Sequence, residues 1–155
     1  MKVADRIAAL RGEMVREGID IWIVPSADYH QSEYVGSFFK ARQYMTGFTG
    51  SAGTAVFTKD KACLWTDGRY FIQAENELRG SGIVLCKMGE PECDTIEAFL
   101  EKELPETGVI GFDGRTIGVG EGKRYEDAAS FKKGKVSYQF DLIGRIWENR
   151  PRLPD

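Results

Sequence analysis

The amino-acid sequence predicts an α/β fold in which helices flank a mixed sheet of parallel and antiparallel strands. Three observations indicate this class: a helix pattern leads into a strand pattern near the N-terminus, a strand hairpin follows, and short strands then alternate with helices. The chain has 155 residues, which is the length of one domain with a substantial buried core.

The first two elements are a helix and the strand that it feeds. Apolar residues recur on one face of the helix, at Val3, Ile7, Leu10 and Met14. Gly18 then stands where a glycine can end the helix in a left-handed conformation. The run from 19 to 24 is apolar apart from Asp20 and closes at Pro25, which is typical of a central strand covered on both faces.

The middle of the chain predicts a hairpin followed by a capped helix. Strands at 54–58 and 62–66 flank the short polar turn 59–61, which favours antiparallel pairing. Asp67 can cap a helix that runs from about 68 to 78.

Shorter elements fill the rest of the chain. In order, we expect a strand at 83–87, a helix at 95–104 capped by Thr95 or Asp94, a strand at 109–112, a helix at 121–131, a strand at 136–140, and an amphipathic turn or two from 142 to 147. Their alternation favours a mixed sheet between helices.

The charge balance argues against two classes of partner. The formal net charge is −3, and no cluster of lysine and arginine with interleaved aromatic residues occurs, so we expect no nucleic-acid partner. No apolar run reaches the length of a membrane span, and the first residues predict a charged amphipathic helix rather than a signal peptide. These patterns predict a cytoplasmic protein with no membrane partner.

The cysteines predict no disulfide framework and no metal site. Cys63, Cys86 and Cys93 are an odd number without metal-ligand spacing, and the first two stand in apolar, strand-like runs. We therefore expect buried, reduced thiols.

Three glycines, Gly47, Gly50 and Gly53, are spaced three residues apart ahead of the strand at 54–58. A glycine-rich loop can cradle an anion. Phosphate-binding loops run from a strand into a helix, whereas this loop runs into a strand. A tight structural turn is therefore the favoured interpretation.

Two residues are candidates for contact with a ligand. Arg69 stands in the first turn of the helix after Asp67, where a guanidinium opposes the positive end of the helix dipole, so we expect a carboxylate, carbonyl or acidic ligand beside it. His30 follows the end of a central strand, where ligands bind in open α/β sheets. A structural role stays open for both. No nucleophile elbow and no His/Cys cluster for zinc occurs in the sequence, so we expect no catalytic residue.

Several segments together resemble the N-terminal domain of Xaa-Pro aminopeptidase (aminopeptidase P). Four of them, at residues 21–26, 30–34, 47–55 and 65–74, read IWIVPS, HQSEY, GFTGSAGTA and WTDGRYFIQA. Two more, at 109–113 and 142–151, resemble later landmarks of the same domain. The resemblance spans nearly the whole chain and is greatest to the long, cytosolic, three-domain form.

The resemblance implies a creatinase/prolidase-type N-terminal domain whose parent enzyme removes the first residue from peptides with proline at the second position. In that family a separate C-terminal domain holds two divalent metals, usually manganese, through two Asp, one His and two Glu. None of those motifs occurs in this sequence. The chain itself is therefore expected to have no cofactor and no activity alone.

The resemblance also assigns roles to particular residues. Arg69 is expected to contact the peptide substrate at a carbonyl or carboxylate on its distal side, with His30 and Tyr34 near the same rim. It further implies middle and catalytic domains as partners within the parent chain, and a homodimer of the full enzyme. We expect residues 1–141 to form the domain, and residues 142–155 to be a helical turn and an interdomain linker leading to the absent domains.

The leading hypothesis is thus an accessory domain that contributes to the substrate cleft and to assembly. The alternative is a stand-alone peptide-binding or regulatory module of the same fold without peptidase activity. A creatinase-like small-molecule hydrolase is a third reading, which the HQSEY and DGRY motifs disfavour. Coding sequence beyond Asp155 would separate the first two.

Overall fold

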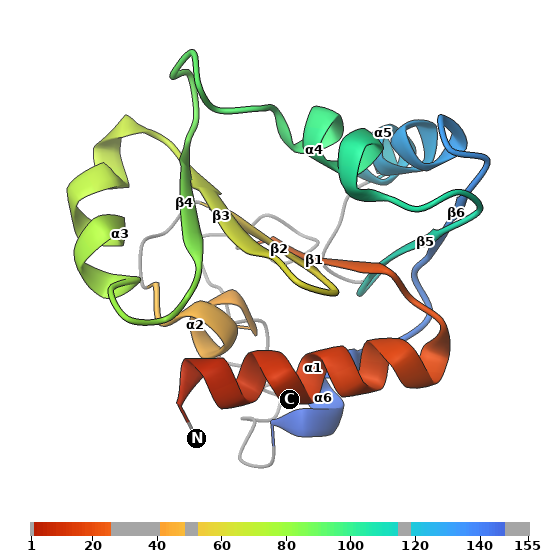
Figure 1. The fold of residues 1–155 in the computed structure, drawn as a ribbon, viewed down its shortest axis with the longest axis horizontal. Helices are drawn as coiled ribbons and strands as arrows, with labels where there is room; N and C mark the ends of the chain where they lie inside the picture. The colour runs from red at the N-terminus through yellow and green to blue at the C-terminus, as the bar shows by residue number, and fades with distance from the viewer. Residues whose placement is uncertain (1, 26–40, 49–52, 115–118, 148–155) are drawn as a thin grey trace.

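The computed structural model describes residues 2–25, 41–48, 53–114 and 119–147 (Figure 1). The helices in these ranges are α1 (Val3–Glu17), α2 (Ala41–Thr46), α3 (Phe71–Glu77), α4 (Ile96–Glu103), α5 (Val119–Ser130) and α6 (Leu142–Ile146). The strands are β1 (Ile21–Pro25), β2 (Thr54–Thr58), β3 (Ala62–Thr66), β4 (Val84–Lys87), β5 (Val109–Phe112) and β6 (Lys135–Ser137). A short 3₁₀ turn, Gly68–Tyr70, precedes α3.

The described strands form one mixed six-stranded sheet in the order β4-β3-β2-β1-β5-β6. β2 pairs in antiparallel fashion with both β1 and β3, and the β2–β3 pair confirms the predicted hairpin. The pairs β1–β5, β5–β6 and β3–β4 are parallel. The predicted mixed sheet is therefore confirmed, with β1 among its central strands.

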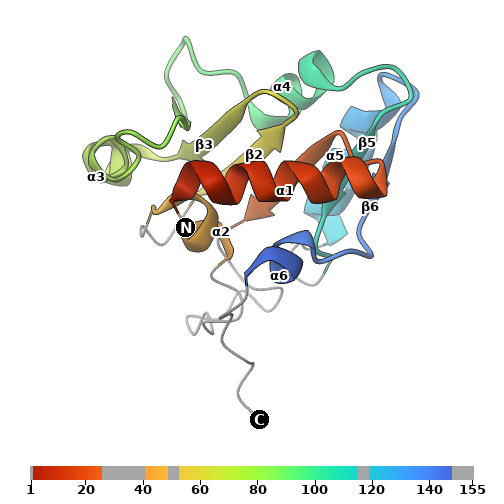
Figure 2. The same ribbon diagram turned by 60° about the horizontal axis from the view of Figure 1, so that its bottom comes forward.

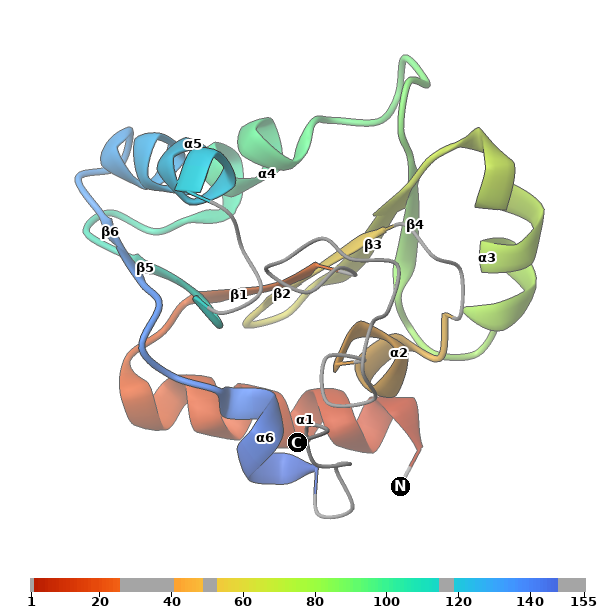
Figure 3. The ribbon, with the colours of Figure 1, turned by 180° about the vertical axis from the view of Figure 1, so that it is seen from behind.

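Helices cover both faces of the sheet. α1, α2, α3 and α6 pack on one face and α4 and α5 on the other, as Figures 1 and 3 show from opposite sides. In Figure 2, α1 crosses in front of the strands with α6 beside it. This arrangement explains the continuous apolar run of β1. Trp22 and Val24 belong to the core under α1, whereas Ile21 and Ile23 belong to the core under α4 and α5.

The predicted caps of two helices are confirmed. Gly18 ends α1 with φ 70° and ψ 31°, the left-handed conformation that glycine adopts without steric cost. Of the two candidates for the cap of α4, Thr95 has this role, because its Oγ1 accepts a hydrogen bond from the Ala98 amide at 3.1 Å.

Two predicted elements need correction. The helix expected from 68 to 78 is a 3₁₀ turn followed by the shorter α3, because the Tyr70 amide bonds the Asp67 carbonyl at 3.0 Å and Tyr70 then leaves helical geometry with φ −118° and ψ 6°. The strand expected at 136–140 is β6, Lys135–Ser137, and its last pair with β5 is Gly111–Ser137.

The last described helix, α6, packs on α1. Leu142 and Ile143 are buried in the core that α1 covers, and Arg145 forms ion pairs with Glu13 and Glu17 of α1 at 3.3 and 3.5 Å. The domain boundary after residue 141 stays a prediction, and residues 148–155 lie outside the described ranges.

Candidate functional site

One end of the sheet brings together segments that are far apart in the sequence. The register Pro25–Thr54 and Thr54–Trp65 places the carboxyl end of β1 beside the start of β2 and the carboxyl end of β3. The parallel partners β4 and β5 finish at this same end. In α/β sheets ligands bind outside the carboxyl ends of strands. We call this region the sheet end.

The turn after β3 presents Arg69 at the sheet end. The Asp67 carboxylate accepts a hydrogen bond from the Arg69 amide at 3.0 Å, which caps the 3₁₀ turn as predicted. The same carboxylate accepts two more from the guanidinium, from Nε at 3.1 Å and from Nη2 at 2.9 Å. The Arg69 side chain is 70% exposed. Its partner is thus a carboxylate two residues back, and its head remains open to solvent.

This pair shifts the titration of both groups. The hydrogen bond from Arg69 holds the pKa of the Asp67 carboxyl below its usual range, and the bond to Asp67 raises the pKa of Arg69. Because Asp67 compensates the guanidinium, the position of Arg69 at a helix start no longer requires a ligand. Arg69 is therefore an exposed cation whose orientation is fixed by two hydrogen bonds from its guanidinium to the Asp67 carboxylate.

A buried arginine, Arg42 of α2, supports this end of the sheet. Only 6% of it is exposed; Nη1 donates to the Gly53 carbonyl at 3.3 Å, and the guanidinium lies 4.9 Å from the Phe48 ring centroid. Phe48 in turn meets Tyr70 edge to face at 6.1 Å. Burial lowers the pKa of Arg42 to about 10, so it stays charged at neutral pH. Sequence reasoning missed Arg42, since no local pattern distinguishes it from surface arginines.

Two of the three spaced glycines have structural reasons. Gly47 has φ 79°, which strains other residues. A side chain on Gly53 would lie 3.1 Å from the Trp65 carbonyl, 3.2 Å from Arg42 Nη1 and 3.3 Å from the Phe48 ring. Both observations support the structural-turn interpretation, while Gly50 lies outside the described residues.

The other two predicted site residues, His30 and Tyr34, also lie outside the described residues. The structure shows that β1, the strand before this segment, ends at Pro25 at the sheet end. It brings Arg69 to the same end. A grouping of the three residues stays a prediction.

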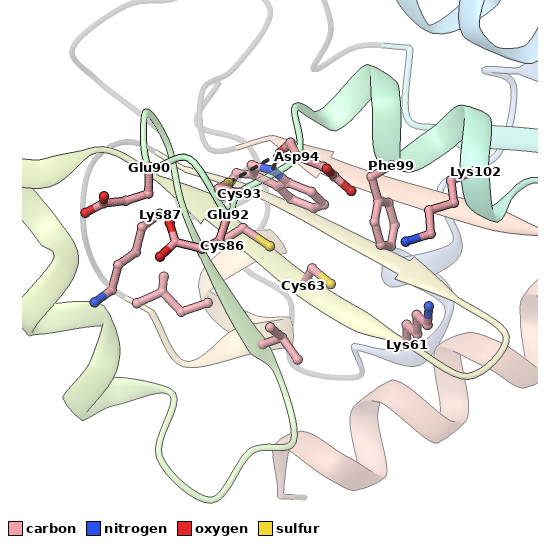
Figure 4. Close-up of a pocket in the computed structure, with 13 residues that line it drawn as sticks. Lys61, Cys63, Cys86, Lys87, Glu90, Glu92, Cys93, Asp94, Phe99 and Lys102 are labelled. Atoms are coloured by element: carbon pink, nitrogen blue, oxygen red, sulfur yellow. Dashed lines mark hydrogen bonds between the residues drawn. The ribbon is translucent and has the colours of Figure 1, made fainter.

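A hollow lies over β3 and β4 on the face of the sheet that α4 covers, and Figure 4 shows it in close-up. It has a volume of about 590 Å³ and is lined by β3, β4, the connection after β4 and α4. All three cysteines line it, and only Cys63 is buried, while Cys86 and Cys93 are half-buried. The expectation of three buried thiols is therefore corrected. We call this hollow the thiol groove.

Within the described ranges, no group of three or more His, Cys, Asp and Glu side chains is arranged to hold a metal ion. The same ranges contain no helix with the length and apolar character needed to cross a bilayer.

The fold defines an α/β domain in which the carboxyl ends of β1, β3, β4 and β5 gather at one end of the sheet. More specifically, the chain belongs to the creatinase/prolidase N-terminal domain family, whose sequence profile matches residues 6–140. Both the resemblance and the fold class read from the sequence are thereby confirmed.

Similar proteins are peptidases that are much longer than this chain. Aminopeptidase P2 of Arabidopsis thaliana is 41% identical over 140 residues, which are 88% of this chain and 20% of that protein. A probable Xaa-Pro aminopeptidase P of Coprinopsis cinerea is 44% identical over 138 residues, or 89% and 21% of the two chains. The chain thus spans about a fifth of these curated relatives.

Solved structures agree with this assignment. The crystal structure of X-prolyl aminopeptidase from Caenorhabditis elegans, described as a cytosolic enzyme with a di-nuclear active site, superposes with a TM-score of 0.88 at 32% identity over 99% of this chain and 27% of that one. The N-terminal domain of the cytoplasmic peptidase PepQ from Mycobacterium tuberculosis has a TM-score of 0.64 at 20% identity, covering 92% of this chain and 98% of that one. The latter shows the shared fold alone.

Proposed function

We propose that this chain is the non-catalytic N-terminal domain of a proline-specific metalloaminopeptidase that removes the first residue from Xaa-Pro peptides. The observation that carries the proposal is the match to the C. elegans enzyme, in which 99% of this chain corresponds to only 27% of the relative. The remaining length of such a protein would hold the catalytic machinery.

The metals belong to that remaining part. The C. elegans relative is described as having a di-nuclear active site. In the parent of this chain, two divalent ions, which we expect to be manganese, would supply the hydrolytic chemistry from the catalytic domain. The present domain would act on the substrate by contact and positioning, and it would be inactive by itself.

Arg69 is the residue that we propose to contact the peptide. Asp67 engages Nε and Nη2, and among the described contacts Nη1 is left available for a ligand. A guanidinium held in this way can donate to a peptide carbonyl or carboxylate without first losing much conformational freedom. His30 and Tyr34 would complete the rim from the segment after β1, and the whole sheet end would form one wall of the substrate cleft.

The test uses the full-length enzyme with manganese and follows release of the first residue from Xaa-Pro-Xaa peptides. Arg69→Ala should lower kcat/KM by roughly 10- to 100-fold, the range expected when a hydrogen bond from a charged group is lost. Arg69→Lys should restore part of it. Peptides with a free C-terminal carboxylate are compared with the corresponding amides. If Arg69 contacts the carboxylate, the wild type should prefer the free acid and Arg69→Ala should lose this preference. If Arg69 contacts a carbonyl, the substitution should lower kcat/KM equally for both peptides.

Arg79→Ala is the matched control, because Arg79 is also exposed and follows α3, with its guanidinium bonded to Asn76 at 3.4 Å. It should leave kcat/KM unchanged. Equal losses in both variants would refute a specific role for Arg69. An inert full-length protein with metal supplied would instead favour a binding or regulatory module.

We also propose that the parent enzyme is a cytoplasmic homodimer. The cytosolic description of the C. elegans relative supports the location. Fractionation of cells that express the full-length protein tests the location, and light scattering of the purified enzyme tests the dimer. A monomeric mass at micromolar concentration would contradict the assembly role.

A further inference from the structure

The thiol groove collects every cysteine of the chain from three separate segments. Cys63 comes from β3, Cys86 from β4, and Cys93 from the connection between β4 and α4. Figure 4 shows all three sulfur atoms within the groove. Cys86 is the central thiol, because the thiols of both Cys63 and Cys93 lie close enough to influence its pKa.

The connection after β4 is folded so that Cys93 returns to Cys86. Two successive turns are closed by bonds from the Glu90 amide to the Lys87 carbonyl at 3.1 Å and from the Cys93 amide to the Glu90 carbonyl at 3.0 Å. Next to Cys93, the Asp94 carbonyl accepts from the buried Trp65 Nε1 at 2.9 Å. This bond anchors the end of the connection on the floor of the groove.

The sheet register distinguishes the two contacts of Cys86. Cys63 pairs with Val84, and Cys86 pairs with Trp65, so Cys63 and Cys86 are diagonal neighbours on regular strands. Diagonal neighbours have Cα atoms roughly 7–8 Å apart, and a disulfide needs about 4.4–6.8 Å. Bridging Cys63 would therefore distort the ladder. Cys93 stands outside the ladder, in the connection between β4 and α4, and it is half-buried like Cys86.

We propose that the thiol groove is an oxidative modification site at which a hydroperoxide converts Cys86 and Cys93 to an intramolecular disulfide. The thiolate of Cys93 attacks one peroxide oxygen; an S–O bond forms, the O–O bond breaks, and hydroxide leaves and is protonated to water. The Cys86 sulfur then attacks the Cys93 sulfur and loses its proton, an S–S bond forms, and the second oxygen leaves as water. Two thiols are oxidised and one hydrogen peroxide is reduced to two waters.

The disulfide would fix the connection after β4 to an edge strand of the sheet. This disulfide should form more slowly than one between exposed cysteines, because the adjacent Cys63 thiol and burial hold the pKa of Cys86 above its usual range, and burial raises the pKa of Cys93. The site would therefore respond to sustained rather than brief exposure to oxidant.

The experiment treats the reduced 155-residue chain with hydrogen peroxide, blocks the remaining thiols and maps the digest without reducing agent. The expected product is a Cys86–Cys93 linked peptide, with Cys63 recovered in its blocked form. The intact mass measured before blocking should be lower by two hydrogens. Cys86→Ser and Cys93→Ser should each abolish that product. Cys63→Ser is the matched control, and it should still form it.

Three outcomes would overturn the proposal. They are a product that links Cys63 to Cys86, a mixture of sulfinic acids and intermolecular dimers without an internal link, and undiminished bridging in Cys93→Ser. Circular dichroism of each reduced variant separates loss of the disulfide from loss of the fold. A variant that does not fold is replaced by selective alkylation of Cys93 in the wild-type chain, which should block the bridge equally.

Discussion

Gly111 in β5 leaves space for a buried tryptophan on the neighbouring strand, so replacing it with alanine should destabilise the domain. Gly111 stands directly opposite Trp22 of β1 in the parallel register. A Cβ at this position would lie 2.8 Å from Trp22 Cε3, 2.9 Å from Cζ3 and 2.9 Å from Ile19 Cγ2. Trp22 is 1% exposed and Ile19 4% exposed, so neither can move into solvent to make room.

The cost follows from the crowding. Forcing one extra carbon into a well-packed core costs about 1–3 kcal/mol. For a domain of this size each kcal/mol lowers the melting temperature by roughly 2–4 °C. Gly111→Ala should therefore melt about 2–12 °C below the wild type in a circular-dichroism scan, and its urea midpoint should fall in proportion.

Gly12→Ala provides the matched control with the opposite sign. Gly12 is an exposed residue of α1 with no atom within 4 Å of the position that a Cβ would take. Alanine should stabilise the helix there by about 0.5–1 kcal/mol, since it costs less backbone entropy. Identical melting of Gly111→Ala and wild type, or equal shifts in both variants, would refute the argument that Gly111 accommodates the Trp22 ring.

Two further predictions concern Asp67 and Trp65. Arg69 depresses the pKa of Asp67 in the folded state, so the pair stabilises the fold above the carboxyl's unfolded pKa, and this stability is lost as pH falls through the lower folded pKa. NMR titration should show the Asp67 pKa return to its usual range in Arg69→Ala. An unchanged pKa would show that another group causes the shift. Trp65→Phe removes the Nε1 bond to the Asp94 carbonyl and leaves unfilled volume, so it should cost about 1–3 kcal/mol in chemical denaturation. A smaller loss of unfolding free energy would mean that water replaces the hydrogen bond of the indole.

The elements read from the sequence are those whose signals are local. The helix-face spacing of Val3 to Met14, the left-handed Gly18 and the polar turn between β2 and β3 each depend on residues within a few positions, and the structure has them where expected. The continuous apolar run of β1 predicts burial on both faces because alternate side chains enter different cores.

The features that sequence reasoning missed depend on contacts between distant segments. Arg42 is buried with its guanidinium against the Phe48 ring and the Gly53 carbonyl, and no local sequence pattern predicts these contacts. The three cysteines meet only because β4 pairs in parallel with β3 and the chain then turns back. The Asp67 contact with Arg69 is local, and the DGR triplet could have revealed it, since a capping carboxylate two residues before an arginine can accept from both its amide and its guanidinium.

β3 links the sheet end and the thiol groove, and this link bears on how their tests are interpreted. The indole of Trp65 bonds the Asp94 carbonyl beside Cys93, while the carbonyl of Trp65 lies where a side chain on Gly53 would meet it, and Asp67 follows two residues later. A change at Trp65 should therefore disturb both the thiol groove and the turn that carries Arg69. Cys86 and Cys93 approach only the groove side, so oxidising them should leave the Asp67 titration and the Arg69-dependent kinetics intact. If the disulfide also altered those two readouts, the sheet end and the groove would be one coupled site, and Arg69→Ala alone could not distinguish ligand contact from a change transmitted through β3.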